Sequence, residues 1–224
     1  MTNILITSGP TREYLDPVRY LTNGSSGRMG AALAEALLQQ GRVPIVVSGP
    51  VSISYPAGAK VHWVETTEQM LQRCLELFPN CAGVIGAAAP CDFRPAAFSE
   101  QKIVKPQEGN ITLHFSETPD ILAALGAIKR PDQWSVAFAL ETHDGRERAW
   151  KKLKQKNCDF VVLNDPRSIN NDEASFHIFD AAGEQRIHFT GTKRVFAEKL
   201  LRLVRKHMSI QRTADNLTFS DDAI

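Results

Sequence analysis

Short apolar runs alternate with longer amphipathic stretches along most of the chain. The runs are rich in Val, Ile and Leu and are bounded by Gly, Pro, Ser or Asn, a pattern typical of buried strands. Strands are predicted at residues 4–6, 44–47, 61–64, 83–86, 135–140, 160–163, 176–179 and 187–189. Several intervening stretches place apolar residues three and four positions apart, which indicates helices that bury one face. Helices are predicted at residues 27–41, 67–78, 118–125, 146–157 and 192–207.

This alternation of strands and helices predicts the fold class. A strand followed by a helix and then another strand favours a parallel sheet covered on both faces. We therefore expect a three-layer, doubly wound, Rossmann-like α/β fold whose sheet is mainly parallel. Residues 1–208 are interpreted as a single domain, and the polar, aperiodic residues 209–224 as a disordered tail.

Two connections are much longer than the rest of this pattern requires. They span residues 9–26 and 90–110, whereas such loops commonly take about 2–6 residues. Each follows a predicted strand and so leaves the sheet at its carboxyl edge, where open α/β sheets bind ligands. Long loops in compact domains commonly carry function, and we expect the second one to act as a flap.

Charge and composition exclude several classes of protein. The chain has 26 Lys and Arg against 25 Asp and Glu, a formal net charge of +1, which gives no overall field to attract nucleic acid or anionic membrane. The longest nearly uncharged apolar run, residues 81–91, is far shorter than the roughly 20 residues of a membrane span. Residues 1–4 contain no basic signal segment. We expect a cytoplasmic protein that binds neither nucleic acid nor membranes.

The four cysteines, Cys74, Cys81, Cys91 and Cys158, show no Cys-x-x-Cys spacing and no neighbouring pair of histidines. That spacing does not favour a zinc site, and a reducing compartment does not favour disulfides. We interpret all four as buried, inert thiols.

A glycine-rich run, Gly24-Ser-Ser-Gly27-Arg-Met-Gly30, opens the first predicted helix. Glycines allow the backbone to approach a ligand closely, and a helix N-terminus presents free N–H groups to anions. The run lies well beyond the first strand, and no acidic residue ends the second strand, so it departs from the dinucleotide fingerprint. It predicts a phosphate-binding loop, with a flexible turn as the plain alternative.

Small residues and a carboxylate follow the fourth strand. Ala88 and Ala89 leave the backbone accessible to the edge of a flat base, and Asp92 could accept from an amino group or help to hold a metal ion. The alternative is an ordinary ion pair between Asp92 and Arg94.

Three lysines complete the set of candidates. Lys102 lies on the second long loop, where an ammonium group could close over a phosphate and stabilise charge at phosphorus. Lys152 and Lys156 are four residues apart on a predicted helix, so both face the same way and could clamp an anion. Each has a plain alternative, solvation on an exposed surface. Together these residues predict a site for a phosphate-rich nucleotide.

The order of these motifs resembles the phosphopantothenoylcysteine synthetase family. The resemblance is carried by Ile6-Thr-Ser-Gly-Pro-Thr-Arg-Glu13, Leu15-Asp-Pro-Val-Arg-Tyr20 and Thr22-Asn-Gly-Ser-Ser-Gly-Arg-Met-Gly30. Residues 88–95, 102–105, 118–122 and 138–142 are similar to later motifs of the family, and the similarity covers residues 4–205. Because the signature begins at residue 4, we expect a free-standing synthetase without the fused flavin-dependent decarboxylase, and no flavin.

The resemblance implies a ligase that joins 4'-phosphopantothenate to L-cysteine in coenzyme A biosynthesis. The carboxylate is activated by a nucleoside triphosphate with Mg²⁺, usually CTP in bacteria, and cysteine then displaces the nucleoside monophosphate. It also implies a homodimer, catalytic roles for Asn23 and Lys102, and no protein-held metal. By resemblance the nucleotide contacts Gly9, Ser25, Ser26, Gly27, Ala88, Ala89, Asp92, Thr118, Pro119, Phe138, Lys152 and Lys156.

The chain departs from the family pattern at three points. Val104 replaces a flap lysine, Thr118 replaces an asparagine, and Pro90-Cys91 replaces Val-Ala. The choice between CTP and ATP therefore stays open. Two other hypotheses are a short-chain-type NAD(P)-dependent oxidoreductase, for which the chain lacks the Tyr-x-x-x-Lys pair, and a catalytically silent nucleotide-binding regulator.

Overall fold

The computed structural model describes residues 2–105, 109–140, 145–164, 171 and 173–218, with side chains through residue 209. Its centre is an eight-stranded sheet in the order β12-β11-β10-β9-β6-β1-β4-β5. The strands are β1 (Asn3–Ser8), β4 (Val43–Ser48), β5 (Lys60–Trp63), β6 (Gly83–Gly86), β9 (Trp134–Leu140), β10 (Phe160–Asn164), β11 (Glu173–Asp180) and β12 (Gln185–Thr192).

Six neighbouring strands, from β5 to β10, run parallel to one another. Taken in chain order they form the 3-2-1-4-5-6 arrangement of a doubly wound sheet. β11 is antiparallel to β10, and β12 is antiparallel to β11. The predicted Rossmann-like, mainly parallel class is confirmed. The strand order reverses between β1 and β6, so a ligand crevice is expected at their carboxyl ends.

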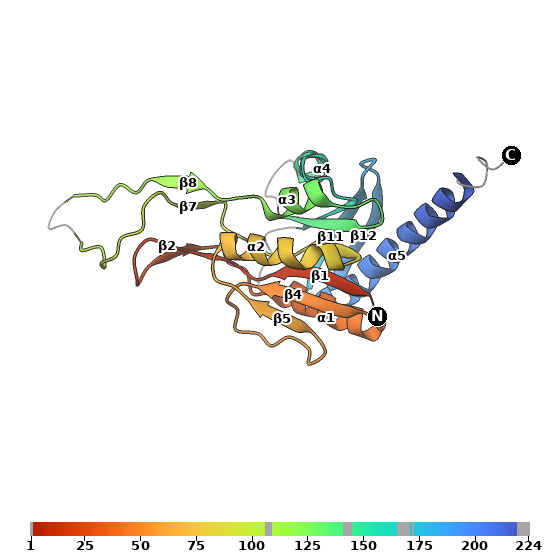
Figure 1. The fold of residues 1–224 in the computed structure, drawn as a ribbon, viewed down its shortest axis with the longest axis horizontal. Helices are drawn as coiled ribbons and strands as arrows, with labels where there is room; N and C mark the ends of the chain where they lie inside the picture. Colours follow the sequence, from red (N-terminus) through yellow and green to blue (C-terminus); the bar gives the residue numbers. More distant parts are fainter. Residues whose placement is uncertain (1, 106–108, 141–144, 165–170, 172, 219–224) are drawn as a thin grey trace.

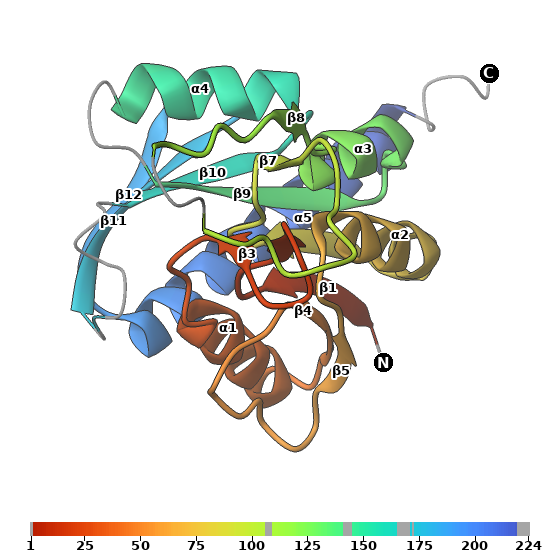
Figure 2. The ribbon, with the colours of Figure 1, turned by 90° about the vertical axis from the view of Figure 1, so that its left-hand side faces the viewer.

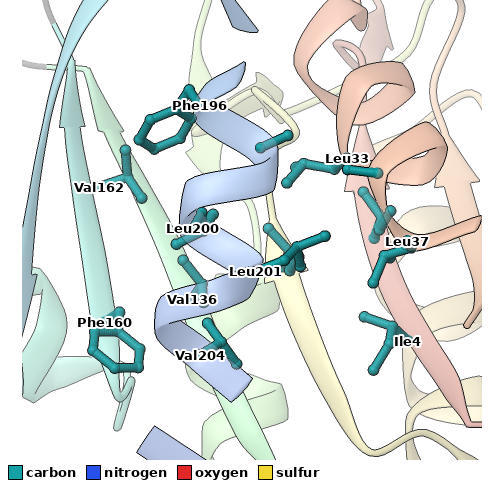
Figure 3. Packing of buried hydrophobic residues seen from close by; sticks show 14 of the residues in the cluster. Ile4, Leu33, Leu37, Val136, Phe160, Val162, Phe196, Leu200, Leu201 and Val204 are labelled. Atoms are coloured by element: carbon teal, nitrogen blue, oxygen red, sulfur yellow. The ribbon is translucent and has the colours of Figure 1, made fainter. Parts of the chain in front are cut away.

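Helices cover both faces of the sheet (Figure 2). α1 (Arg28–Gln39) and α5 (Lys193–Thr218) pack on one face, and α2 (Thr67–Leu77), α3 (Ile121–Ile128) and α4 (Gly145–Gln155) on the other. Side chains of β1 alternate between the two cores, since Ile4 and Ile6 pack with α1 and Leu5 packs with α2. Phe196 and Leu200 of α5 reach across to Val162 of β10 (Figure 3).

Two glycines set the start of α1. Gly27 is its N-cap residue and has a left-handed backbone with φ of 74°, a conformation that glycine adopts at little cost. A Cβ atom on Gly30 would lie 2.0 Å from Ser8 Oγ, so α1 packs directly on the end of β1. The glycine-rich run therefore also serves helix packing at the sheet edge.

An arm projects from the carboxyl edge of the sheet (Figure 1). It consists of residues 12–22 and 93–117, apart from 106–108, which lie outside the described residues. β2 (Arg12–Tyr14) pairs with β3 (Tyr20–Thr22), and β7 (Phe93–Pro95) pairs with β8 (Phe115–Glu117). The first predicted long loop, residues 9–26, thus contains both β2 and β3, whereas the second, residues 90–110, contains β7 and its partner β8 follows the loop. Each strand is only three residues long, which leaves too few positions for a period-two pattern to be recognised.

α5 extends further than the sequence predicted. It was expected to end at residue 207, with a disordered tail from residue 209, but the structure continues the helix to Thr218. Residues 219–224 lie outside the described residues. A short 3₁₀ turn, Phe78–Asn80, follows α2. Within the described part of the chain, no helix combines the length and apolar character that crossing a membrane requires.

Candidate functional site

A cavity of about 540 Å³ opens at the carboxyl ends of the strands, where the strand order reverses. Its walls come from the end of β1, the segment before α1, the segment after β6, the start of α3, β9 and α4. Twelve of the fourteen site residues predicted from the sequence line it: Asn23, Ser25, Ser26, Gly27, Ala88, Ala89, Asp92, Thr118, Pro119, Phe138, Lys152 and Lys156. Segments far apart in the sequence therefore converge on one cavity. Gly9 and Lys102 are not among its lining residues.

Asn23 joins two walls of the cavity. Its Nδ2 donates to the carbonyl oxygens of Pro90, at 2.9 Å, and Ala89, at 3.3 Å. The amide group is thus oriented before any substrate arrives, with its Oδ1 left to accept. A substrate oxygen that takes an N–H from Asn23 has to share or replace one of these two bonds.

The segment after β6 is held beside the segment after β1. The backbone N–H of Ala87 donates to the Thr7 carbonyl at 3.1 Å, and that of Ala89 donates to the Gly9 carbonyl at 2.9 Å. Ala88 N–H donates to Thr7 Oγ1 at 3.3 Å. Gly9 therefore supports Ala89 from behind, with a left-handed backbone at φ of 73°, instead of lining the cavity.

Lys152 of α4 and Lys156, the residue directly after α4, lie opposite the start of α3. Lys156 Nζ forms an ion pair with Asp120 Oδ2 at 2.9 Å, while Asp120 Oδ1 caps α3 by accepting from Ala123 N–H at 3.0 Å. Lys152 lines the same wall. The cavity thus places two ammonium groups and one carboxylate together, an arrangement that can bind phosphate or a metal-bound phosphate.

Lys102 lies on the arm, where its neighbour Ile103 is held firmly. The backbone N–H of Ile103 donates to Asp16 Oδ2 at 3.0 Å, and its carbonyl accepts from Arg19 Nη1 at 2.8 Å. Arg19 also forms an ion pair with Asp16 at 2.9 Å. Burial raises the pKa of the Asp16 carboxyl, but the three backbone N–H donors and the Arg19 charge outweigh burial and lower the pKa below its ordinary value.

Sequence reasoning missed several residues of the cavity. Three polar residues that line it are Arg28, Asn164 and Lys193. Asn164 ends β10 and Lys193 begins α5, so the carboxyl-edge rule applied to every parallel strand would have identified Asn164. No motif marked Lys193. Glu141 and Thr142, part of a motif noted in the sequence, lie outside the described residues.

The described residues contain no group of three or more His, Cys, Asp or Glu side chains arranged to hold a metal ion. All four cysteines are free thiols and are buried.

Comparison with protein families identifies the domain. Residues 1–208 match the model of the DNA/pantothenate metabolism flavoprotein C-terminal domain. The chain belongs to this family. The flavoprotein C-terminal domain thus accounts for nearly the whole chain, and the family resemblance found in the sequence is confirmed.

Known members of the family are similar to this chain in sequence and in fold. The chain is 36% identical over 210 residues to the coenzyme A biosynthesis bifunctional protein CoaBC of Vibrio cholerae, covering 92% of this chain and 52% of that protein. It therefore spans about half the length of such relatives. A crystal structure of the C-terminal domain of CoaBC matches with a TM-score of 0.80 and 34% identity, covering 93% of this chain and 96% of that one.

A more distant structure shares the fold alone. The Cab2 mutant H337A, in complex with phosphopantothenate-cysteine, has a TM-score of 0.77 at 17% identity, with 96% of this chain and 89% of that chain covered.

Proposed function

We propose that this domain is a phosphopantothenate–cysteine ligase that acts in coenzyme A biosynthesis. The observation that carries the proposal is that Asn23, the glycine loop (residues 24–27) and the lysines at the end of α4, Lys152 and Lys156, line one cavity at the switch point of the sheet. The family assignment, and the name of the CoaBC relatives, support the same substrate class.

The proposed reaction has two steps. A carboxylate oxygen of 4'-phosphopantothenate attacks the α-phosphorus of a nucleoside triphosphate, and pyrophosphate leaves. The amine of L-cysteine then attacks the acyl carbon, forms the amide, loses a proton and displaces the nucleoside monophosphate. Activation is needed because a free carboxylate oxygen is a very poor leaving group, whereas a nucleoside monophosphate leaves readily.

Each wall of the cavity has a part in this proposal. Gly24, Ser26 and Gly27 offer backbone N–H groups to phosphate oxygens at the start of α1. The N–H of Ser25, which lines the same wall, donates to the Asn23 carbonyl at 2.9 Å. Lys152 and Lys156 offer charge to a second phosphate group. The N–H of Asn23 stabilises negative charge on the acyl oxygen, a kind of donor whose loss costs about 3–4 kcal/mol of barrier.

The metal ion in this scheme is Mg²⁺, which would enter with the nucleotide. Mg²⁺ is commonly held by one or two carboxylates together with substrate phosphates, and Asp92 and Asp120 are the carboxylates that line the cavity. When bound, Mg²⁺ neutralises charge on the phosphates. CTP is the proposed nucleotide, with ATP as the alternative.

The proposed assembly is a homodimer formed through the arm. Nine of the thirteen exposed large hydrophobic side chains among the described residues lie there, which is far more than scattered surface exposure would give. They are Val18, Tyr20, Leu21, Phe93, Phe98, Val104, Ile111, Leu113 and Phe115. The four free thiols support a reducing, cytoplasmic location.

A four-nucleotide assay tests the proposal. Phosphopantothenate, cysteine and Mg²⁺ are incubated with CTP, ATP, GTP or UTP, and both the monophosphate and pyrophosphate are measured. We expect the two products in equal amounts with CTP, and only when phosphopantothenate is present. If no nucleotide gives either product, the ligase assignment is wrong, and tight binding of NADPH would favour an oxidoreductase instead.

A further inference from the structure

Both peptide groups of Cys91, which lies between cavity residues Pro90 and Asp92, are held by threonine side chains. The N–H of Cys91 donates to Thr11 Oγ1 at 2.8 Å. Its carbonyl accepts from Thr67 Oγ1 at 3.3 Å and from Thr118 Oγ1 at 2.5 Å. The three threonines come from three separate segments: the turn after β1, the first residue of α2 and the approach to α3.

The hydroxyl groups of Thr11 and Thr67 also bond to each other, at 2.8 Å. Each hydroxyl has a single hydrogen to donate. Because Thr67 donates to Cys91, the O–H of Thr11 has to donate to Thr67. The three groups then form a closed ring in which Cys91 donates to Thr11, Thr11 to Thr67, and Thr67 back to Cys91.

This ring is buried and is anchored to β2 of the arm. Thr11, Thr67 and Cys91 are 0%, 1% and 2% exposed. The backbone N–H of Thr67 donates to the buried carboxylate of Glu13 at 2.8 Å, which fixes the start of α2 against β2. Buried hydrogen-bond networks that are fully satisfied hold one geometry, because every alternative leaves a polar group unpaired.

We propose that Thr67 is a positioning residue for nucleotide selection. Through Cys91 it sets the position of the Ala88–Asp92 edge, which is the wall that would face the base. The inference rests on the proposed ligase function and deepens it. Thr67 does not line the cavity, so it acts on the nucleotide indirectly, through its bonds to Cys91 and Thr11.

Thr118 was predicted to contact the nucleotide, and in this geometry its two hydrogen-bond donors support the Ala88–Asp92 edge. Its hydroxyl hydrogen is directed to the Cys91 carbonyl, and its backbone N–H donates to the Asp92 carbonyl at 3.0 Å. Both donors of Thr118 are thus committed to the edge that they support. Selection among bases then depends on where Thr67 and Thr118 hold that edge.

The test compares Thr67→Val, which removes the hydroxyl at nearly constant shape, with Thr67→Ser, which keeps it. In the four-nucleotide assay we expect Thr67→Val to raise the nucleotide KM about tenfold, the effect of one lost buried hydrogen bond. We also expect Thr67→Val to reduce selectivity, measured as kcat/KM for the preferred nucleotide divided by kcat/KM for the second-best nucleotide. The KM for phosphopantothenate should stay within about twofold, and Thr67→Ser should match the wild type. Thr190→Val, on the exposed face of β12, is the matched control.

Amide hydrogen exchange adds a reading that needs no turnover. Faster exchange of Cys91 N–H in Thr67→Val than in Thr67→Ser supports the ring. The inference is overturned if the wild type is active and Thr67→Val keeps the nucleotide selectivity of the wild type. It is also overturned if Thr67→Val raises the KM for nucleotide and the KM for phosphopantothenate by the same factor. A wild type that neither binds nor turns over any of the four nucleotides overturns the proposed function and this inference together.

Discussion

The ammonium group of Lys156 forms an ion pair with the Asp120 carboxylate, 2.9 Å away, at the wall of the cavity. Lys156 was predicted to bind a nucleotide phosphate, and the structure places that lysine beside a competing anion. The side chain of Lys156 is 21% exposed and that of Asp120 is 46% exposed, so water screens the pair only in part. A phosphate that binds Lys156 therefore has to compete with Asp120 or bring a cation that Asp120 can contact.

We expect Asp120→Asn to strengthen binding of nucleotide in the absence of Mg²⁺. Asparagine keeps the side-chain oxygen that caps α3 but removes the charge that opposes phosphate. Lys156→Met should have the reverse effect, about threefold to tenfold weaker binding. Titration of CTP without metal, followed by calorimetry, measures both changes. The control is Lys151→Met, which changes an exposed lysine of α4. Stronger binding of CTP by Lys156→Met than by Lys151→Met would contradict the argument.

Lys102→Gln should slow the first step of the proposed reaction far more than it weakens nucleotide binding. Loss of a charge that acts mainly on the transition state lowers kcat and kcat/KM together and leaves the dissociation constant of the nucleotide nearly unchanged. Release of pyrophosphate in a single turnover measures the step, and CTP titration measures binding. Equal losses in both would show that Lys102 contributes only to ground-state binding. Lys105→Gln, three residues along the same segment, is the control.

Asp16→Asn should loosen the arm around Lys102. The carboxylate of Asp16 accepts from Ile103, Val18 and Arg19 backbone N–H groups and from the Arg19 guanidinium, and an amide oxygen with no charge holds these donors less well. We expect faster hydrogen exchange at Ile103 and faster proteolysis within residues 99–105. Unchanged exchange at Ile103 would argue against the contact between Asp16 and the flap.

The same carboxylate gives a dependence on pH with a defined sign. The pKa of Asp16 is lowered in the folded protein, so ionised Asp16 stabilises the fold at neutral pH. This contribution is complete above the ordinary carboxyl pKa of about 4. It is lost as the pH falls through the lower folded value. The wild-type melting temperature should therefore fall more steeply below about pH 4 than that of Asp16→Asn, and parallel curves would contradict the assignment.

The hydrophobic pattern predicted the sheet and its helices because each of these elements buries one or two faces, and the buried positions are apolar residues at a regular spacing in the sequence. Val84 and Ile85 of β6, for example, are fully buried between helices on two faces. The short strands of the arm have no such pattern of buried apolar residues. β3 and β8 are exposed at every position, so their pairing depends on tertiary contacts instead of on a period.

Much of the candidate site followed from the carboxyl-edge rule and from the family resemblance, since the motifs lie at strand ends. Lys102 could not be placed this way, because a residue on a long connection is positioned by partners such as Asp16 that are remote in sequence. The ring around Cys91 was equally hidden. No spacing of threonine and cysteine residues in a sequence predicts that they will form hydrogen bonds with each other. Residues 11, 67 and 91 come together only in the folded protein.

The cysteines should react slowly with thiol reagents while the protein is folded. Burial raises the pKa of Cys74 to about 12 and the pKa values of Cys81 and Cys158 to about 11, and burial also raises the pKa of Cys91. Because the thiolate is the reactive form, labelling at pH 8 should be slow, and denaturant should release all four thiols at once. One thiol that reacts rapidly in the native protein would contradict this burial.

Gly30→Ala should destabilise the protein although alanine is the better helix former. Alanine in a helix interior gains up to about 1 kcal/mol over glycine. At this position the new Cβ would lie 2.0 Å from Ser8 Oγ and 2.5 Å from Ser8 Cβ, so α1 has to move away from β1, and overpacking of this kind costs about 1–3 kcal/mol. The steric cost should therefore dominate and lower the free energy of unfolding in urea.

Gly24→Ala is the matched control for this substitution. It lies six residues earlier in the same glycine-rich run, and no atom lies within 4 Å of its added Cβ. We expect its free energy of unfolding to stay within about 0.5 kcal/mol of the wild type. If Gly30→Ala were as stable as Gly24→Ala, α1 would not rest on the end of β1 as described. The glycine loop would then lack the rigid backing that holds its N–H groups toward the cavity.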